Sequence, residues 1–373
     1  MKKVFTRSIL LAMVLVLLSS CVAPNNNENN NSTQIEEEAK EEMIINPIDQ
    51  TYTKQAGIEV IYLAGGCFWG LEKLMQSIPG VVDAVSGYAN GDLDVIPTYS
   101  IVTTRNTGYR ETVRVTYDPE KISLDAILFA YFHVIDPTIT NRQGNDIGSQ
   151  YQTGVYYADE NAKTVVERIA AIESARHEKF VVEIEALERF FDAEEYHQNY
   201  LDKNPSGYCH ISSDEMSAIS GMIIDPGNYP LPPASQIKSM LSELQYNVTQ
   251  LAATEQAFMN EYWDNHARGI YVDIVTGEPL FSSTDKFDSG TGWPSFSKPI
   301  DENTMRYITD VSFGMQRVEV RSRAGNSHLG HVFENDPTSP SGIRFCINSA
   351  ALKFIPYEDL ETTGYGYLKD LVK

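Results

Sequence analysis

Ile58-Glu59-Val60-Ile61-Tyr62-Leu63-Ala64-Gly65-Gly66-Cys67-Phe68-Trp69-Gly70 is the stretch that decides the fold of the first half of the chain. Its apolar start predicts a strand over 58–64, Gly65-Gly66 predicts a tight turn, and a helix is expected over 67–77. Free backbone N–H groups and the helix dipole at such a junction stabilise a thiolate and lower its pKa. The stretch therefore predicts a reactive thiol at Cys67, although a buried structural cysteine in an aromatic core is the alternative.

Similar patterns later in the first half predict strands over 111–117 and 153–157 and helices over 124–134 and 160–177. Strands and helices mixed in this order predict an α+β fold that begins with a ferredoxin-like α/β sandwich. A stretch rich in Pro, Ser and Gly between Ile211 and Gln236 predicts an interdomain connector. We expect mostly helix over 236–266 and then, from Gly269, a small mainly-β domain with this helical lead-in.

Composition excludes several classes of protein. The chain has 373 residues, enough for two or three domains, and 29 Lys plus Arg against 51 Asp plus Glu give a net charge of -22. Such acidity argues against nucleic acid as a partner. Four cysteines without a C-x-x-C pair exclude a disulfide scaffold and a thiolate zinc site of that kind; they are Cys21, Cys67, Cys209 and Cys346.

The N-terminus is typical of an exported protein. Residues 1–20 combine a basic start with an apolar run that is too short to span a bilayer, which predicts a signal peptide. Leu18-Ser19-Ser20-Cys21 resembles the lipobox of bacterial lipoproteins, which implies that Cys21 carries fatty acyl chains such as palmitate. An ordinary cleaved signal with an incidental cysteine is the alternative. Residues 21–57, rich in Asn and Glu, are expected to form a disordered acidic tether.

A carboxyl group is the second candidate for chemistry in the first half. Alternation over 111–117 places Glu111 on the same face as Val113 and Val115, where burial would raise its pKa and make it a proton donor near neutral pH. Because Glu111 begins the strand, an exposed position at the strand end is equally compatible with the pattern.

Four motifs in this half together resemble methionine sulfoxide reductase A over about 58–210. They are Gly65-Gly66-Cys67-Phe68-Trp69-Gly70, Pro97-Thr98-Tyr99, Thr107-Gly108-Tyr109-Arg110-Glu111 and the run from Arg142 to Tyr151. The resemblance implies that Cys67 attacks the sulfoxide sulfur and that Glu111 protonates the departing oxygen. It also implies that the hydroxyls of Tyr99 and Tyr151 hold the oxygen and that the rings of Phe68 and Trp69 enclose the methyl group. Asp146 would help to order the site, and a role that only caps its loop is the alternative.

Attack of this kind leaves a cysteine sulfenic acid, which a second thiol can convert to a disulfide. Cys209, in the Pro- and Gly-containing segment Asn204-Pro205-Ser206-Gly207-Tyr208-Cys209, is the candidate. A static structural disulfide between Cys67 and Cys209 is the alternative.

The second half has its own group of candidates. Strand alternation in Arg344-Phe345-Cys346-Ile347-Asn348 sets Arg344, Cys346 and Asn348 on one face, and the cation favours the thiolate. His328 and His331 alone fit half of a metal site, general acids or ordinary polar residues. With the run from Asp285 to Phe296, however, these residues resemble methionine sulfoxide reductase B over about Ser235 to Glu358.

This second resemblance implies that Cys346 is the nucleophile and Arg344 helps to activate it. His328 and His331 would orient and protonate the sulfoxide oxygen, Asn348 would support them, and Trp293 would pack against the methyl group. A core position for Trp293 and a surface position for Arg344 are the alternatives.

Two departures from the reductase B pattern change the expected chemistry. Many relatives bind structural zinc through two C-x-x-C pairs, whereas the matching positions here are Asp273, Thr276, Ser322 and Gly325, so we predict no metal. Thr291 stands where some relatives carry a recycling cysteine. The sulfenic acid of Cys346 is therefore expected to react with an external thiol or with Cys209.

The chain is thus interpreted as a signal peptide (1–20), a lipidated tether (21–57), a reductase A domain (58–210), a linker (211–234), a reductase B domain (235–360) and a tail (361–373). The resemblances imply reduction of methionine sulfoxide in oxidised proteins or peptides, the S epimer in the first domain and the R epimer in the second. No cofactor is expected. We expect the protein to lie on the extracytoplasmic face of a bacterial cell membrane, where a thioredoxin-like reductant would regenerate its thiols. A thiol peroxidase and a lipid-anchored solute-binding or adhesion protein are the rival classes, and neither explains two unrelated cysteine sites.

Overall fold

The computed structural model describes residues 48–314 and 316–372. The signal peptide, Cys21 and most of the tether therefore lie outside the described residues. Within them, no helix has both the length and the apolar character needed to cross a bilayer.

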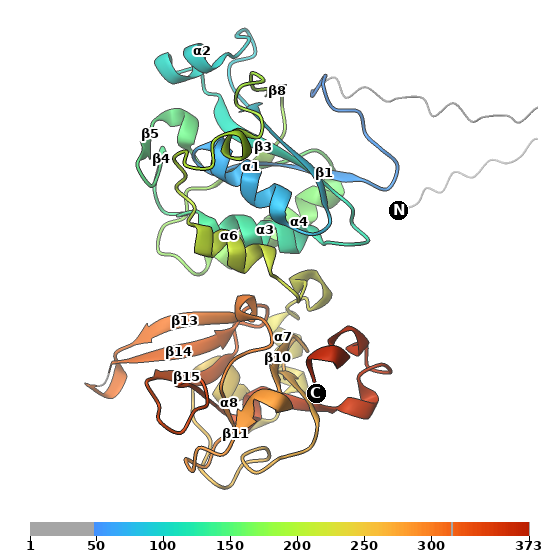
Figure 1. Cartoon of the computed structure of the whole chain (residues 1–373), viewed down its shortest axis with the longest axis vertical. Helices are drawn as coiled ribbons and strands as arrows, with labels where there is room; N and C mark the ends of the chain where they lie inside the picture. Colours follow the sequence, from blue (N-terminus) through green and yellow to red (C-terminus); the bar gives the residue numbers. More distant parts are fainter. Residues whose placement is uncertain (1–47, 315, 373) are drawn as a thin grey trace, which may run out of the picture. The chain divides into compact units, whose positions relative to one another are not determined.

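The first domain is built on a six-stranded sheet in the order β7-β6-β1-β3-β2-β8 (Figure 1). Its strands are β1 (Glu59–Ala64), β2 (Val81–Ala89), β3 (Arg110–Tyr117), β6 (Gly154–Tyr157), β7 (Glu183–Ala186) and β8 (Phe190–Asp192). All neighbouring pairs are antiparallel except β6 and β7. The mixed α+β architecture predicted for this half is confirmed.

Three helices cover one face of this sheet: α1 (Phe68–Ser77), α3 (Leu124–Val134) and α4 (Glu160–Ser174). They pack there on apolar side chains of the strands. Ile61 and Leu63 of β1 share one buried cluster with Leu71 of α1, Ile127 of α3 and Val166 of α4. On the other face, the segment before β1 covers Tyr62 and Phe190 with Tyr52.

The remaining elements of the first half are short. They are α2 (Tyr99–Thr104), β4 (Arg142–Gln143), β5 (Asp146–Ile147), the 3-10 turn η1 (Ser149–Tyr151), α5 (Tyr200–Lys203) and α6 (Ser213–Ser220). Helix α6 begins at a capping box formed by Ser212 and Glu215, and its Ile219 is fully buried in the core of the first domain. A second 3-10 turn, η2 (Pro226–Asn228), follows in the predicted connector.

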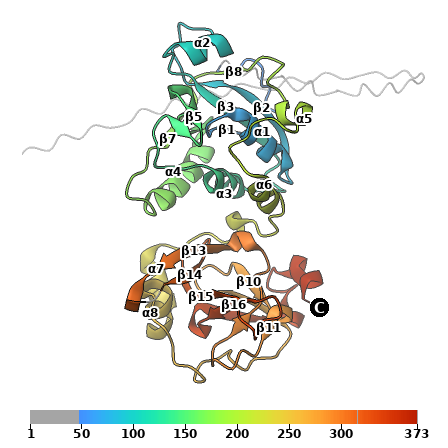
Figure 2. The same cartoon turned by 60° about the vertical axis from the view of Figure 1, so that its left-hand side comes forward.

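The second domain is mainly β (Figure 2). Its larger sheet has the order β11-β12-β16-β15-β14-β13, and a three-stranded sheet has the order β10-β9-β17. The strands are β9 (Gly269–Asp273), β10 (Pro279–Ser282), β11 (Lys286–Phe287), β12 (Ser295–Phe296), β13 (Met305–Asp310), β14 (Arg317–Ser322), β15 (His328–Glu334), β16 (Ile343–Ile347) and β17 (Leu352–Pro356). After them, a 3-10 turn over Gly366–Leu371 buries Leu368.

The helical lead-in is shorter than predicted. Helices α7 (Ala234–Met240) and α8 (Glu243–Leu251) form, but the chain then leaves the helix at Ala252, which takes a left-handed conformation. The expectation of helix up to 266 is wrong because tertiary contacts take over. The backbone N–H of Phe258, for example, donates to the carbonyl of Gly292 at 2.9 Å, so this segment follows the second-domain loops.

Two candidate active sites

Cys67 and Glu111 meet in the first domain. Cys67 is the N-cap of α1 and is 6% exposed, and Glu111 on β3 is 2% exposed. The N–H of Phe68 donates to Glu111 Oε2 at 3.3 Å. Glu111 thus lies on the apolar face of its strand, and the alternative of an exposed strand end is excluded.

Burial raises the pKa of Glu111 to about 8, and the charge of Asp146 adds to the rise, while the Phe68 N–H opposes it. At neutral pH this carboxyl group is therefore mostly protonated and can donate a proton. Glu111 Oε1 is buried and has no hydrogen-bond partner among the described residues.

The expected low pKa of Cys67 is wrong. Burial, followed by the charge of Glu111, raises the pKa of the thiol, and the backbone N–H of Trp69 opposes this only in part. Loss of water around the charged form raises a thiol pKa, and at Cys67 this effect exceeds the stabilisation from the helix N-terminus. Cys67 is therefore a protonated thiol in the resting site and must lose its proton as it reacts.

The other predicted residues lie around this pair. Tyr99 begins α2, Tyr151 ends η1 and Asp146 begins β5. Burial and then the charge of Glu111 raise the pKa of both tyrosines, and the charge of Cys67 contributes to each rise. Both hydroxyls are therefore protonated at neutral pH and can donate hydrogen bonds. Burial also raises the pKa of Asp146, against the effects of Tyr208 and His210.

An aromatic wall stands beside Cys67. Trp69 stacks on Tyr200 with ring centroids 3.7 Å apart, and its Nε1 donates to His197 Nδ1 at 3.1 Å. The His197 ring also lies 5.0 Å from that of Phe68 and 4.6 Å from that of Tyr99. The sequence analysis did not identify His197, because the rings of Phe68, Trp69 and Tyr99 that this histidine contacts lie more than 90 residues away in the sequence.

Glu194 is a second residue that the sequence analysis missed. Its Oε2 accepts from the hydroxyl of Tyr88, and its Oε1 accepts from the backbone N–H of Tyr99, each at 2.9 Å. The carboxylate thus fixes the start of α2 and with it the position of Tyr99.

Cys209 lies against the first turn of α1. A methyl group added at Gly70 would stand 2.7 Å from Cys209 Sγ, so only glycine leaves room for the thiol at this position. Cys67 and Cys209 are both free thiols in the structure, which does not contain the static disulfide.

The second site is assembled across β15 and β16. Cys346 is the direct cross-strand partner of His331, and Ser295 of β12 faces it on the other side. Cys346, His331, Asn348, Trp293, Arg317 and Thr254 line one pocket. Trp293 therefore faces the site, and the alternative of a purely core position is excluded.

Each histidine is held by a carboxylate that the sequence did not single out. His328 Nδ1 lies 2.6 Å from Glu319 Oε1, and His331 Nε2 lies 2.9 Å from Asp310 Oδ2. Such partners fix the ring orientation and decide which nitrogen carries a proton. His328 is buried, whereas His331 lines the pocket, so His331 is the imidazole that a substrate can reach.

Arg344 lies close enough to affect Cys346. Its Nε donates to Asp336 Oδ2 at 2.6 Å and its guanidinium covers the ring of Phe333, so it is not a free surface cation. Burial raises the pKa of Cys346, while Arg344 and Thr291 both oppose the rise. The expected activation by Arg344 is present, but burial outweighs it.

Asn348 supports the site through the backbone. Its Nδ2 donates to the Leu329 carbonyl at 3.0 Å, and its Oδ1 accepts from the Glu255 N–H at 3.1 Å. The carbonyl of Glu255 in turn accepts from Trp293 Nε1 at 3.2 Å. Asn348 thus ties β15, the loop before β9 and the pocket tryptophan together.

Of the four positions that match zinc ligands in relatives, Asp273, Thr276 and Ser322 are joined by hydrogen bonds, and Gly325 packs against them. The carboxylate of Asp273 is buried and accepts from the hydroxyls of Ser322 and Ser327. A methyl group at Gly325 would stand 2.1 Å from Asp273 Oδ2. Over residues 48–314 and 316–372 no three His, Cys, Asp or Glu side chains are grouped to hold a metal ion. The absence of zinc stays a prediction.

The first site places a buried thiol beside a carboxyl group, and the second places a partly buried thiol beside an imidazole. A thiol next to a group that can exchange a proton is typical of thiol-dependent oxidoreductases. Residues 59–221 match the family model described as peptide methionine sulfoxide reductase, and residues 241–356 match the SelR domain. The chain belongs to the methionine sulfoxide reductases, with a reductase A domain fused to a reductase B domain. Its two activities reduce the S and the R epimer of methionine sulfoxide.

Solved structures of similar proteins cover the reductase A type. Mxr1 from Saccharomyces cerevisiae in reduced form is 35% identical over 44% of this chain and 97% of that chain, with a TM-score of 0.42. Methionine sulfoxide reductase A of Corynebacterium diphtheriae is 39% identical over 42% of this chain and 79% of its own, with a TM-score of 0.38. Mxr1 from Saccharomyces cerevisiae in complex with Trx2 is 25% identical over 41% of this chain and 92% of its own, with a TM-score of 0.30.

Proposed function

We propose that Cys67 and Glu111 carry out the reduction in the first domain together. Glu111 gives its proton to the sulfoxide oxygen while the sulfur of Cys67 attacks the sulfoxide sulfur. One S–O bond breaks in the substrate and one forms on Cys67, which leaves methionine and a cysteine sulfenic acid, and the proton lost by the thiol restores the carboxyl group. The buried carboxyl group of Glu111, which accepts from the N–H of Phe68 directly after Cys67, is the observation that carries this mechanism.

The other residues of the first site hold the substrate. The hydroxyls of Tyr99 and Tyr151 donate to the sulfoxide oxygen as negative charge develops on it. The rings of Phe68 and Trp69 enclose the methyl group, and Asp146 orders the loop before η1. Cys209 then attacks the sulfenic acid, which yields a Cys67–Cys209 disulfide and one water. An external dithiol, of thioredoxin type, reduces that disulfide.

In the second domain Cys346 is the nucleophile, and His331 protonates the oxygen. His328 orients His331 from behind, Trp293 packs against the methyl group, and Arg344 moderates the pKa of the thiol. Asn348 holds the pocket in shape. Thr291 cannot form a disulfide, so the sulfenic acid of Cys346 is reduced by an external thiol or by Cys209.

Cys209→Ser tests the recycling step. Without added reductant, wild-type protein given the S epimer should form one methionine in the first domain and lose two free thiols. The variant should form the same first methionine but hold the sulfenic acid, which a dimedone probe labels. With a thioredoxin system as reductant, its steady-state rate should fall about tenfold or more. Two thiols still lost in the variant would contradict the assignment.

We further propose that Cys21 anchors the protein by lipid to the extracytoplasmic face of a bacterial cell membrane, where it repairs proteins damaged by oxidative stress. The support is the signal-like run before Cys21 and the acidic segment after it. Two acyl chains bind a membrane stably, so the wild type should sediment with membranes. Cys21→Ala should appear in the soluble fraction, and an unchanged distribution of this variant would argue against the anchor.

A further inference from the structure

The segment that carries Cys209 continues directly into a connector that the second domain binds. Cys209 stands three residues before Ser212, the N-cap of α6, and the chain then runs through α6 to residues 221–225. The two ends of this stretch are therefore only 16 residues apart in sequence, and whatever fixes one end limits where the other can go.

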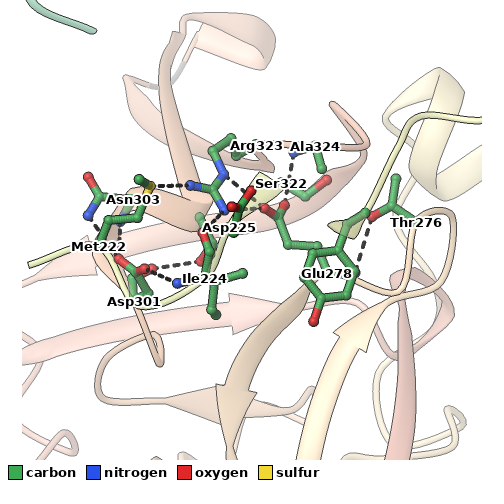
Figure 3. Close-up of polar contacts among 12 residues, drawn as sticks. Met222, Ile224, Asp225, Thr276, Glu278, Asp301, Asn303, Ser322, Arg323 and Ala324 are labelled. Atoms are coloured by element: carbon green, nitrogen blue, oxygen red, sulfur yellow. Dashed lines mark hydrogen bonds and ion pairs between the residues drawn. The ribbon is translucent and has the colours of Figure 1, made fainter. Parts of the chain in front are cut away.

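Three side chains of the second domain hold the end of this stretch (Figure 3). Asp301 Oδ2 accepts from the backbone N–H groups of Ile223 at 2.7 Å and Ile224 at 3.0 Å. Arg323 Nη2 donates to the Ile224 carbonyl at 2.7 Å. Asn303 Nδ2 donates to the Ala218 carbonyl, inside α6, at 2.8 Å. Hydrogen bonds to charged side chains are among the stronger ones, so the connector is firmly held.

The holding groups are themselves fixed. Arg323 is 4% exposed and its Nε donates to the fully buried Glu278 at 2.8 Å, while the other oxygen of Glu278 accepts from the Ala324 N–H. Asn303 donates through its own Nδ2 to Asp301 Oδ1 at 2.9 Å. A buried and fully paired network of this kind holds one geometry, because each unpaired group would be costly.

The first domain holds the same connector from its own side. Asp225 accepts from the backbone N–H of Ser123 at 2.8 Å and from its hydroxyl at 2.5 Å. In contrast, residues 204–206 on the other side of Cys209 are exposed. The segment around Cys209 is thus exposed to solvent upstream, over 204–206, and is held downstream by hydrogen bonds from both domains.

Formation of the disulfide requires Cys67 Sγ and Cys209 Sγ to approach each other from their positions in the structure. The two sulfurs must come within about 2 Å of each other, whereas both thiols are free here and Cys209 packs on Gly70. A moving segment delivers its thiol more often when one of its ends is fixed close by, because fewer conformations compete with the reactive one.

We propose that Asp301, Asn303 and Arg323 of the second domain are positioning residues for the recycling of Cys67 in the first. They hold the downstream end of the Cys209 segment and so raise the effective concentration of its thiol at the sulfenic acid. The step itself is the one given above, with a disulfide and water as products and no further reductant. This inference rests on the proposed role of Cys209.

Asn303→Ala and Arg323→Met test the proposal in the full-length chain with Cys346→Ala, so that only the first domain consumes thiols. In a single turnover with the S epimer, the first methionine should form at the unchanged rate. The Cys67 thiol is consumed in that first step, so the later loss of the Cys209 thiol reports the disulfide. This loss, measured by quenching and counting thiols, should be slowed about threefold to tenfold. Reduction of the R epimer by the same variants with Cys346 intact shows that the second domain is folded.

Arg268→Met is the matched control. Arg268 also belongs to the second domain, donates to a backbone carbonyl, that of Val372, and covers an aromatic ring, that of Tyr357, but it does not bind the connector. Thiol loss at the wild-type rate in both test variants, or equal slowing by Arg268→Met, would overturn the proposal. The Cys346→Ala parent with Cys209 intact is measured before any variant. If it forms no disulfide, Cys209 does not recycle Cys67, and the proposal that rests on this role is overturned as well.

Discussion

Cys67→Ser is expected to abolish reduction of the S epimer of a methionine sulfoxide peptide and to leave reduction of the R epimer intact, while Cys346→Ser should do the reverse. A serine hydroxyl is a poor nucleophile at sulfur and cannot accept the oxygen as a sulfenic acid, so each selective loss should be about 10⁴-fold or more. Chromatography that separates the two epimers measures both rates in one sample.

The selectivity follows from the two pockets. In the first domain Glu111 on β3, the proposed proton donor, accepts from the N–H of Phe68 next to the thiol, and the stacked rings of Trp69 and Tyr200 lie nearby. In the second domain His331 faces Cys346 across neighbouring strands, and Trp293 lines the same pocket. Each pocket fixes oxygen and methyl group on set sides, so each accepts one epimer. Cys209→Ser serves as the control, because it should form the first methionine from both epimers. Partial loss of both activities in each variant would contradict separate sites.

Glu111→Gln is expected to lower kcat for the S epimer about 10²- to 10³-fold without affecting the R epimer. Glutamine keeps the size of the side chain and can still accept from the Phe68 N–H, but it has no acidic proton to give. In the wild type, kcat for the S epimer should fall as pH rises through about 8, because the pKa of Glu111 lies there and only the protonated form donates. The variant should lack this decline.

Glu72→Gln is the matched control for Glu111→Gln. Glu72 is also a buried carboxyl in the first domain, with a pKa raised to about 7 by burial, but its Oε2 accepts from the backbone N–H of Asn199 rather than from the turn at Cys67. It should keep the S-epimer activity and its pH profile. A Glu111→Gln enzyme that retains most of its kcat, or a wild-type profile that stays flat to pH 9, would show that another group protonates the oxygen.

Local patterns predicted the elements that carry the chemistry. The Gly65-Gly66 turn predicted Cys67 at the start of α1, because this depends on neighbouring residues only. Strand alternation offered a buried Glu111 as one of two positions, and the structure selects it. The same holds for the helix over 124–134, which has the predicted bounds.

Features that depend on distant parts of the chain could not be predicted. The pKa of Cys67 depends on how deeply the finished fold buries it, and the helix N-terminus alone suggested the wrong direction. Glu319 and Asp310 meet the two histidines only across β14 and β13, and nothing in the spacing of the sequence marks them. The end of the helix at Leu251 has a similar origin, since Phe258 in the next segment is held by Gly292, 34 residues away.

The unpaired oxygen of Glu111 has a consequence for the stability of the first domain. Folding raises the pKa of this carboxyl from an ordinary 4.5 to about 8, so at pH 7 the folded chain binds a proton that the unfolded chain releases. Stability therefore decreases as pH rises from about 4.5 to about 8, by about 3 kcal/mol at pH 7 for this one group. The domain gives up part of its folding free energy in order to keep a proton next to its nucleophile, and an inactive protein with an apolar residue at this position would not bear that cost.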